Sequence, residues 1–336
     1  MSSSGLKTIN FQIMTNDNKQ QKLSDSTEPA IAYSTCYAQP SIQLFNCDNL
    51  EIMKMLTDES VDVILTDPPY LYLKNQKLER PFDEQLFFNE CKRLLTKKGF
   101  IVMFGRGTSF YRWNTILADL GLKFKEEIIW NKSMGTSPLS KLCRIHETVS
   151  VFCKGNGSIN KNKIPYLESK NFNLEKIQVD INRINSTLGN PKSIKFLKDF
   201  IEGYRSDMEL NTVFTKHAVT SDIRKSGARE VNTLASIQNG ITEKSIIHIV
   251  REHYNTIHPT QKPVRLLERL LALVIPKDKE SKDITVLDPF GGSFSTMEAV
   301  YNMQMKGISC EIDKEYFEAG KERIEKLPPH QTALFD

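Results

Sequence analysis

Short apolar runs that alternate with helix-like segments constrain the fold of this chain more than any other feature. Runs of strand length lie at 42–45, 61–66, 100–104, 127–130 and 147–152, and helical spacing marks 50–56, 84–95 and 111–120, with Gly99 expected to end the second helix. Strands and helices that alternate over about 110 residues are typical of βαβ units and a mostly parallel sheet. The sequence therefore predicts an α/β fold with a doubly wound sheet.

The alternation stops after residue 154 and resumes near residue 258. Residues 155–250 are rich in Asn, Lys and Ser, and their clearest helical segment is 192–204. Beyond 258, a helix follows Pro263, and the spacing then predicts strands at 285–288 and 307–311 and helices at 294–305 and 316–327. We therefore divide the chain into a polar extension at 1–40, two halves of one α/β domain at 41–154 and 251–330, and an inserted region at 155–250.

The charge of the chain is unevenly distributed. The 336 residues carry a net charge of +4, but the span from Lys154 to Lys244 holds fifteen Lys and Arg against ten Asp and Glu, so the positive excess lies in the inserted region. This distribution suits a nucleic-acid partner, and a solvated basic surface is the alternative. No apolar run has the length of about 20 residues that a membrane span needs, and the N-terminus lacks a basic-then-apolar signal pattern.

The cysteines form no recognisable pattern. None makes a CxxC pair and their spacing is irregular; they are Cys36, Cys47, Cys91, Cys143, Cys153 and Cys310. We expect reduced thiols in a cytoplasmic protein, with neither a disulfide framework nor a metal site.

A carboxylate, two prolines and a tyrosine follow the apolar run at 61–66. Proline fixes φ and has no N–H, so the carbonyl groups of Asp67-Pro68-Pro69-Tyr70 are held in a fixed array. The Asp67 carboxylate and the Pro68 carbonyl are acceptors, and the Tyr70 ring can stack on a flat group. Two acceptors that bind the hydrogens of a nucleobase amine free its lone pair for attack on an electrophile. A rigid turn with a capping Asp is the alternative.

A loop with two glycines follows the strand at 285–288. Gly291 and Gly292 let the backbone approach a ligand closely, and the next helix offers free N–H groups at its N-terminus. Glu311 lies twenty positions after Gly291, where an acid accepts hydrogen bonds from ribose hydroxyls in doubly wound folds. The loop matches neither GxGxxG nor GxxxxGK[ST], so it indicates a ligand with a ribose but specifies neither a dinucleotide nor a nucleoside triphosphate. A plain strand-to-helix turn with a surface Glu is the alternative.

Both motifs should face one cleft, because the carboxyl ends of parallel strands share one edge of an open sheet. Together with a third motif they carry a resemblance. TDPPY at 66–70, HPTQKP at 258–263 and LDPFGGSFST at 287–296 resemble, in this order, the motifs of the S-adenosylmethionine-dependent DNA amino-methyltransferases of the permuted (beta) class. The resemblance spans about residues 42–327 apart from the middle. It implies a Rossmann-like methyltransferase fold, a catalytic half at 41–154, a target-recognition region at 155–250 and a cofactor-binding half at 251–330.

The resemblance also implies roles for single residues. Those that grip the target amine and stack on a flipped base are Asp67, Pro68, Pro69 and Tyr70. Those that bind the cofactor S-adenosylmethionine are Asp48, Asp67, His258, Thr260, Lys262, Asp288, Phe290, Gly291, Gly292, Ser293 and Glu311. Within this set, Glu311 matches the ribose acid and Asp48 the position at the adenine edge, while Lys262 has the charge to meet the cofactor carboxylate. The family loop often reads GSG where this chain has GSF, so we expect Phe294 to narrow the loop or to pack beneath it.

The first residue of the catalytic motif indicates the target base. Adenine-N6 enzymes of this family mostly carry DPPY and cytosine-N4 enzymes mostly carry SPPY, so Asp67 favours adenine N6. The base must flip out of the duplex to be reached. The loop 71–82 would cover the flipped base or contact the DNA backbone through Lys74, Lys77 and Arg80, although a solvated position is the simpler reading for any single one. The resemblance implies double-stranded DNA as the substrate and a nucleoid-associated location, and it leaves open a homodimer and a cognate restriction endonuclease as partners.

Three alternatives remain from the sequence. The first is a methyltransferase that acts on another amine, namely cytosine N4, an RNA base or a protein side chain. The second is a nicotinamide-dependent enzyme, in which DPPY would have no task. The third is a catalytically dead DNA-binding relative, which the intact Asp67 and Gly291-Gly292 disfavour.

Overall fold

A nine-stranded sheet organises the residues that the computed structural model describes, which are 36–38, 41–70, 80–133, 135, 141–188, 228–251 and 256–329. All of them fall in the unit Tyr33–Asp336. The strands follow one another across the sheet in the order β1 (Cys36–Ala38), β2 (Ile42–Phe45), β11 (Lys306–Cys310), β10 (Thr285–Asp288), β3 (Val61–Thr66), β4 (Leu95–Gly105), β6 (His146–Cys153), β5 (Lys123–Asn131) and β9 (Ile246–His248).

The sheet is mostly parallel, as predicted. Five of the eight strand pairs are parallel: β2–β11, β11–β10, β10–β3, β3–β4 and β5–β9. The neighbours β4–β6 and β5–β6 are antiparallel, as is β1 beside β2 at one sheet edge. Strands β5 and β6 are consecutive strands that pair antiparallel as a hairpin, so β6 runs opposite to both of its neighbours in the sheet.

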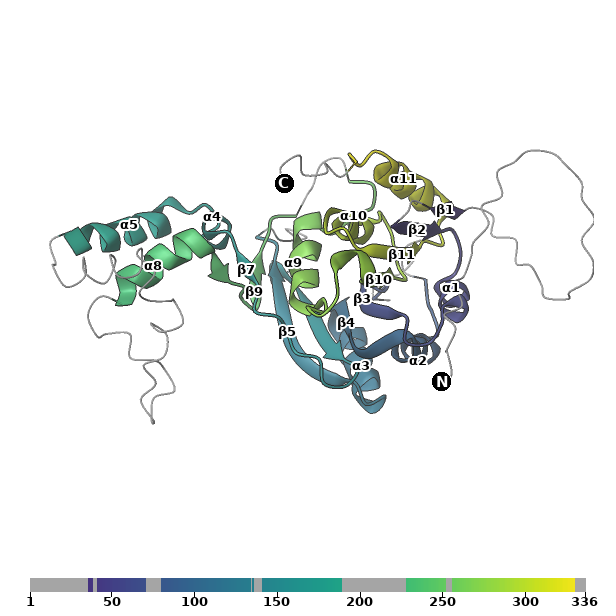
Figure 1. Cartoon of the computed structure of the whole chain (residues 1–336). Helices are drawn as coiled ribbons and strands as arrows, with labels where there is room; N and C mark the ends of the chain where they lie inside the picture. The colour runs from purple at the N-terminus through teal and green to yellow at the C-terminus, as the bar shows by residue number, and fades with distance from the viewer. Residues whose placement is uncertain are drawn as a thin grey trace, which may run out of the picture. The chain divides into compact units, whose positions relative to one another are not determined.

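Helices cover both faces of the sheet. On one face lie α1 (Asn49–Met55), α2 (Glu84–Leu94) and α3 (Gly107–Asp119), and on the other lie α9 (Val264–Val274), α10 (Ser295–Asn302) and α11 (Lys314–Glu325) (Figure 1). Strand β3 serves both faces, because Val63 and Leu65 join the core beneath α9 and α10 while Ile64 joins the core beneath α2 and α3. A strand buried on both faces reads as a continuous apolar run, which is why 61–66 was recognisable from sequence.

The predicted end of the second helix was wrong. The second helix ends at Leu94 and not at Gly99, because Leu95 already has an extended backbone and begins β4. Gly99 lies within that strand, where a Cβ would be 3.1 Å from the Asp62 carbonyl oxygen and 3.0 Å from the Thr96 hydroxyl. Close packing of the neighbouring strand therefore accounts for this glycine, and helix termination does not.

The inserted span contains a small helical lobe that returns to the sheet. Its described elements are β7 (Lys163–Ile164), α4 (Tyr166–Ser169), α5 (Leu174–Leu188), α8 (Ala228–Asn239) and β8 (Ile241–Thr242), after which β9 joins the main sheet. Strands β7 and β8 pair with each other, and the Glu243 amide donates to the Asn162 carbonyl at 2.8 Å, so the lobe begins and ends at one point. The helix predicted at 192–204 lies outside the described residues. None of the described helices is long and apolar enough to cross a membrane.

Candidate active site

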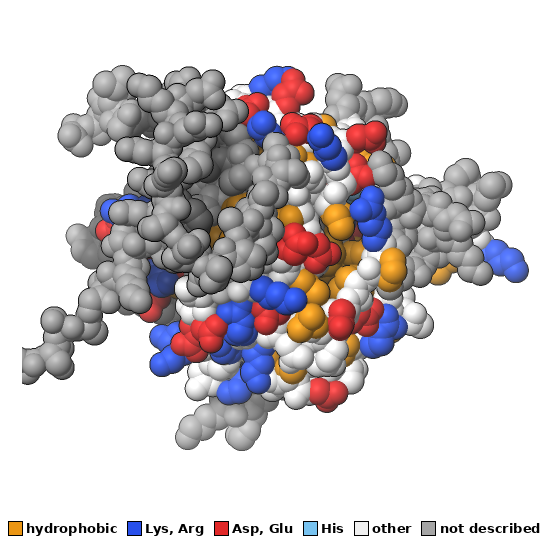
Figure 2. Space-filling model, turned by 90° about the vertical axis from the view of Figure 1, so that its right-hand side faces the viewer, with side chains coloured by type: hydrophobic (Ala, Val, Ile, Leu, Met, Phe, Trp, Pro, Cys, Tyr) orange, Lys and Arg blue, Asp and Glu red, His pale blue; other side chains and the backbone are white. Residues whose placement is uncertain are grey.

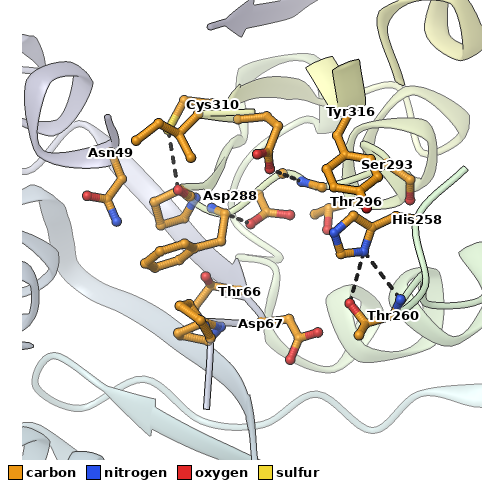
Figure 3. Close-up of a pocket in the computed structure, with 18 of the residues that line it drawn as sticks. Asn49, Thr66, Asp67, His258, Thr260, Asp288, Ser293, Thr296, Cys310 and Tyr316 are labelled. Atoms are coloured by element: carbon orange, nitrogen blue, oxygen red, sulfur yellow. Dashed lines mark hydrogen bonds between the residues drawn. The ribbon is translucent and has the colours of Figure 1, made fainter. Parts of the chain in front are cut away.

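The carboxyl ends of β3, β10 and β11 open into one cavity of about 510 Å³. Every described residue that the sequence nominated lines it: Asp48, Asp67, Pro68, Pro69, Tyr70, Arg80, His258, Thr260, Lys262, Asp288, Phe290, Gly291, Gly292, Ser293 and Glu311. Figure 3 shows several of these side chains converging from different elements. Lys74 and Lys77 lie outside the described residues. The parallel topology thus unites motifs that are more than 200 positions apart in the chain.

The Asp67 carboxylate is held on both of its oxygens. The Tyr70 hydroxyl donates to Oδ1, and the Lys262 ammonium donates to Oδ2. The Ser109 hydroxyl donates to the Tyr70 carbonyl at 2.7 Å, and the Tyr70 ring lies 6.2 Å from the ring of Trp113. The DPPY turn is therefore fixed from the side of α3 as well as by its prolines.

The ammonium of Lys262 also belongs to a longer chain of ion pairs. Its Nζ lies 3.3 Å from Oε2 of Glu147, whose Oε1 accepts from the Lys132 ammonium at 2.8 Å. Neither Glu147 nor Lys132 belongs to a motif that predicted a site residue. The pairing of β5 with β6 could have revealed both residues. In this hairpin Trp130 lies opposite Glu147, and Lys132 follows Trp130 by two positions at the same sheet edge.

Burial and the neighbouring charges shift the pKa values of the groups in this chain of ion pairs. Burial raises the pKa of the Asp67 carboxyl, while the Lys262 ammonium opposes that rise. Burial also acts to raise the pKa of Glu147, but its two lysine neighbours together lower it to about 2. Burial acts to lower the pKa of Lys262, and its two carboxylate neighbours raise it instead. Of the two carboxyl groups beside Lys262, Glu147 is therefore the firmly ionised one, and Asp67 has the higher pKa.

The glycine loop makes room for a ligand on one side and for an aromatic ring on the other. Gly292 has φ of +53°, and a Cβ on Gly291 would lie 2.3 Å from the Phe294 ring. Phe294 itself is fully buried with φ of 55°, and its ring meets that of Phe317 at 5.9 Å. Phe294 therefore packs beneath the loop, which is one of the two outcomes that the sequence predicted for it.

Glu311 and Asp288 place two carboxyl groups at the loop. Glu311 accepts from the Gly292 amide at 2.9 Å and, with its other oxygen, from the Asp313 amide at 2.8 Å. Burial raises the pKa of Glu311 and raises that of Asp288 to about 7. Two carboxyl groups with raised pKa values in one cavity are characteristic of a functional site.

Other nominated residues shape the rim. Asp48 caps α1 by accepting from the Leu50 amide at 2.9 Å. His258 lies against the Tyr316 ring at 4.5 Å, and its Nδ1 lies 3.0 Å from the Thr260 hydroxyl (Figure 3). Burial lowers the pKa of His258 to about 4, so its imidazole is neutral at pH 7. Arg80 reaches Asp313 at 3.4 Å and so links the end of the DPPY loop to the start of α11.

Two further polar atoms line the cavity without a hydrogen-bond partner among the described residues. They are Oγ1 of Thr66 and Oδ1 of Asn49, both buried. In Figure 3, Thr66 lies next to Asp67. Asn49 lies apart from both, across the cavity. A buried polar atom without a partner costs about 1–3 kcal/mol, so a ligand that bonds to these atoms would recover that free energy. Sequence patterns gave no signal for either residue.

Comparison with known proteins agrees with this geometry. The chain is 28% identical over 292 residues to the type II methyltransferase M.HpaI of Haemophilus parainfluenzae, covering 83% of this chain and 73% of that protein. It is 25% identical over 313 residues to the DNA adenine methyltransferase YhdJ of Escherichia coli, covering 89% and 87% of the two chains. Among solved structures, PvuII DNA methyltransferase (cytosine-N4-specific) matches its fold with a TM-score of 0.50 at 15% identity, over 87% of this chain and 88% of that one.

A family match decides the class of protein. The family model described as DNA methylase, of the N6 and N4 type, matches residues 61–322. That range includes the DPPY turn, the inserted lobe, the glycine loop and Glu311. The methyl donor of such enzymes is S-adenosylmethionine. With its motifs in one cavity and its sequence matched over most of its length, this chain belongs to the N6/N4 family of DNA methylases.

Proposed function

We propose that this protein transfers a methyl group from S-adenosylmethionine to the exocyclic N6 amine of an adenine that is flipped out of double-stranded DNA. The observation that carries the proposal is the placement of the Asp67 carboxylate and the Tyr70 ring in the same cavity as the glycine loop and Glu311. An acceptor and a ring at one end of a cavity suit an aromatic amine. The loop and acid at the other end suit a nucleoside.

The chemistry of the cavity fits S-adenosylmethionine. The oxygens of Glu311 can accept from ribose hydroxyls, since a carboxylate offers about four lone-pair sites and each oxygen now uses one. Gly292 lines the cavity, where a Cβ would reach only ordinary contact with the His258 ring at 3.6 Å, and Thr66 and Asn49 offer buried oxygens that have no hydrogen-bond partner among the described residues. Other residues that we propose to contact the cofactor are Asp48, Asp67, His258, Thr260, Lys262, Asp288, Phe290 and Ser293. When bound, S-adenosylmethionine supplies an electrophilic methyl group.

The residues of the chain act on the target amine. We assign Asp67 and the Pro68 carbonyl as acceptors of its two hydrogens, which directs the nitrogen lone pair toward the methyl group. Tyr70 stacks on the flipped base and so recovers about 1–3 kcal/mol of the unstacking free energy, while Pro69 holds the turn rigid. Because the Tyr70 hydroxyl bonds to Asp67 in this structure, base entry must exchange that bond for one from the amine.

Adenine is favoured over cytosine by Asp67, since the family's cytosine enzymes mostly carry Ser at this position. Relatives point in both directions: YhdJ is named an adenine methyltransferase, and the PvuII enzyme is named cytosine-N4-specific. At 15% identity, the likeness to the PvuII enzyme concerns the fold alone. Methylation of cytosine N4 is therefore the second candidate function.

We further propose that residues 155–250 read the DNA sequence, between a catalytic half at 41–154 and a cofactor-binding half at 251–330. The net positive charge of this span supports the assignment. On the face shown in Figure 2, by contrast, basic and acidic side chains lie side by side over the described surface and offer phosphates no uniformly positive track. Arg80, Lys74 and Lys77 would contact the base or the backbone. A homodimer and a cognate restriction endonuclease are possible assemblies and partners, the latter because relatives are type II methyltransferases.

A comparison of substrates tests the proposal. Labelled S-adenosylmethionine is incubated with the protein and, separately, with duplex DNA, RNA of the same sequence and a mixture of proteins. We expect label in duplex DNA alone. Label in RNA or protein would move the activity to another amine, and binding of DNA without any transfer would identify a catalytically dead relative.

A further inference from the structure

The ion-pair chain Lys132–Glu147–Lys262–Asp67 extends beyond the residues that the proposed function uses. Its members come from four places: the end of β5, the start of β6, the segment before α9 and the end of β3. Their side chains are 5%, 16%, 8% and 22% exposed, in that order. Neither Glu147 nor Lys132 lines the cavity, so only Asp67 and Lys262 can meet a ligand directly.

We propose that Glu147 is a positioning residue for methyl transfer, which shares the Lys262 ammonium with Asp67 and thereby keeps Asp67 a strong acceptor for the target amine. The proposal rests on the assignment of Asp67 as an amine acceptor. Lys262 has three N–H groups, and its ammonium forms ion pairs with both carboxylates, with Nζ 3.3 Å from Oε2 of Glu147.

The physical reason is a competition for one cation. Asp67 must be ionised and must also have acceptor strength to spare for the amine. Lys262 donates to Oδ2 of Asp67, and a Lys262 ammonium that paired with Asp67 alone would neutralise most of its negative charge. Without Lys262 the buried carboxyl would take up a proton. The Glu147 carboxylate sets a balance between an Asp67 that Lys262 neutralises and an Asp67 that is protonated. Lys132 donates to Glu147 at 2.8 Å and keeps it in place.

The pKa shifts of the ion-paired groups agree with these roles of Glu147 and Asp67. The two ammonium groups lower the pKa of Glu147 to about 2, whereas burial raises that of Asp67. Other titratable groups face the chain: the Tyr70 hydroxyl from the DPPY turn, Asp288 from β10 and His258 from the segment before α9. Since the pKa of His258 is about 4, it contributes no positive charge near neutral pH.

A second buried ion pair on the same strand provides a matched control. At the opposite end of β3, Asp62 accepts from the Lys279 ammonium at 2.7 Å and from the Thr285 amide at 3.1 Å, and its side chain is 4% exposed. Asp62 does not line the cavity. Replacement of Asp62 by Asn therefore removes a buried, lysine-paired carboxylate without altering the active site.

The experiment compares Glu147→Gln, Asp62→Asn and Lys262→Met with the unaltered enzyme. The kcat for methyl transfer to duplex DNA and the KM for S-adenosylmethionine are measured between pH 5 and pH 9. For Glu147→Gln we expect kcat at pH 7.5 to fall about tenfold, equivalent to about 1.4 kcal/mol, because Glu147 acts on the reacting group only through Lys262. The KM should change less than about twofold, because no contact to the cofactor is lost.

The pH profile separates positioning from a structural role. The acidic limb of the profile of kcat against pH is the fall of kcat as Asp67 takes up a proton. In Glu147→Gln, Lys262 pairs with Asp67 alone, which lowers the pKa of Asp67, so this limb should move to lower pH. In Lys262→Met, Asp67 loses its cation and the limb should move to higher pH. In Asp62→Asn the limb should stay in place. Because Glu147 acts through Lys262, the double variant should show much less than the sum of the two changes.

Two results would overturn the inference. An unaltered enzyme that transfers no methyl to DNA would refute the proposed function and this inference together. An active enzyme in which Glu147→Gln keeps its acidic limb, with kcat reduced no more than in Asp62→Asn, would refute this inference alone and make Glu147 a structural tie of the hairpin.

Discussion

Asp67 combines two requirements that oppose each other, because it must be buried to grip a base and ionised to accept from an amine. The Lys262 ammonium, fixed by the fold, resolves this conflict. In Asp67→Ala we expect methyl transfer to fall at least about 100-fold, the effect of removing one preorganised polar partner at a reacting group. DNA affinity should change little. Fluorescence anisotropy with a labelled duplex measures binding, and retained turnover would refute the role of Asp67.

Glu311 both holds the glycine loop and faces the cavity. Replacement by Ala removes the acceptor for the ribose and the bond to the Gly292 amide. We expect the Kd for S-adenosylmethionine to rise at least about tenfold, equivalent to the 1.4 kcal/mol or more that charge-assisted hydrogen bonds contribute. Calorimetric titration measures it. Glu318→Ala, on the exposed face of α11, is the control, and an unchanged Kd in Glu311→Ala would remove the ribose role.

His258 makes stability depend on pH. Burial lowers its folded-state pKa from 6.5 to about 4, so the folded protein binds fewer protons than the unfolded chain between these values. The contribution of His258 to the free energy of unfolding is fully present above pH 6.5. It falls by at most about 3 kcal/mol as the pH drops toward 4. Denaturant unfolding at several pH values should show that the unaltered protein loses more stability over this window than His258→Gln. Parallel curves would contradict the assignment.

At the scale of elements, the glycine loop and α11 fit around one ring. A Cβ on Gly320 would lie 2.7 Å from the Phe294 ring and 3.2 Å from backbone of the loop. In an exposed helix Gly→Ala stabilises by about 0.5–1 kcal/mol, but here we expect Gly320→Ala to destabilise by about 1–3 kcal/mol through overpacking. Urea unfolding followed by circular dichroism measures the change. A stabilised Gly320→Ala would show that the loop and ring can move apart freely.

Local patterns predicted most elements but not their pairing. Val61–Thr66 and Thr285–Asp288 were placed to the residue because burial on both faces leaves mostly apolar segments, VDVILT and TVLD. Gly99 was misjudged because its reason is a neighbouring strand, which no local window contains. The motifs in the cavity were found because each is contiguous. Glu147 and Lys132 were missed because the register of the hairpin brings them together and the fold then places Lys262, 115 positions after Glu147, beside Glu147.

In the whole molecule, the lobe within 155–250 leaves and rejoins the α/β domain at one point, and Glu168 of the lobe also pairs with Arg265 and Arg269 of α9. The Glu243 amide meets the Asn162 carbonyl at 2.8 Å, so a short Gly-Ser link can replace residues 163–242 while β9 stays in place. We expect this deletion to keep cofactor binding and to lose sequence preference. Sequencing of methylated sites measures it. A truncated enzyme that still modified a single sequence would place recognition elsewhere in the chain.

The methylated atom distinguishes adenine N6 from cytosine N4 as the target of this enzyme. Unmethylated genomic DNA is incubated with the protein and labelled S-adenosylmethionine, then digested to nucleosides and analysed by mass spectrometry. We expect label in N6-methyladenine, and no such label when Asp67→Ala replaces the unaltered enzyme. Label in N4-methylcytosine would contradict the role given to Asp67 in base choice, and DNA without any label would contradict the proposed function itself.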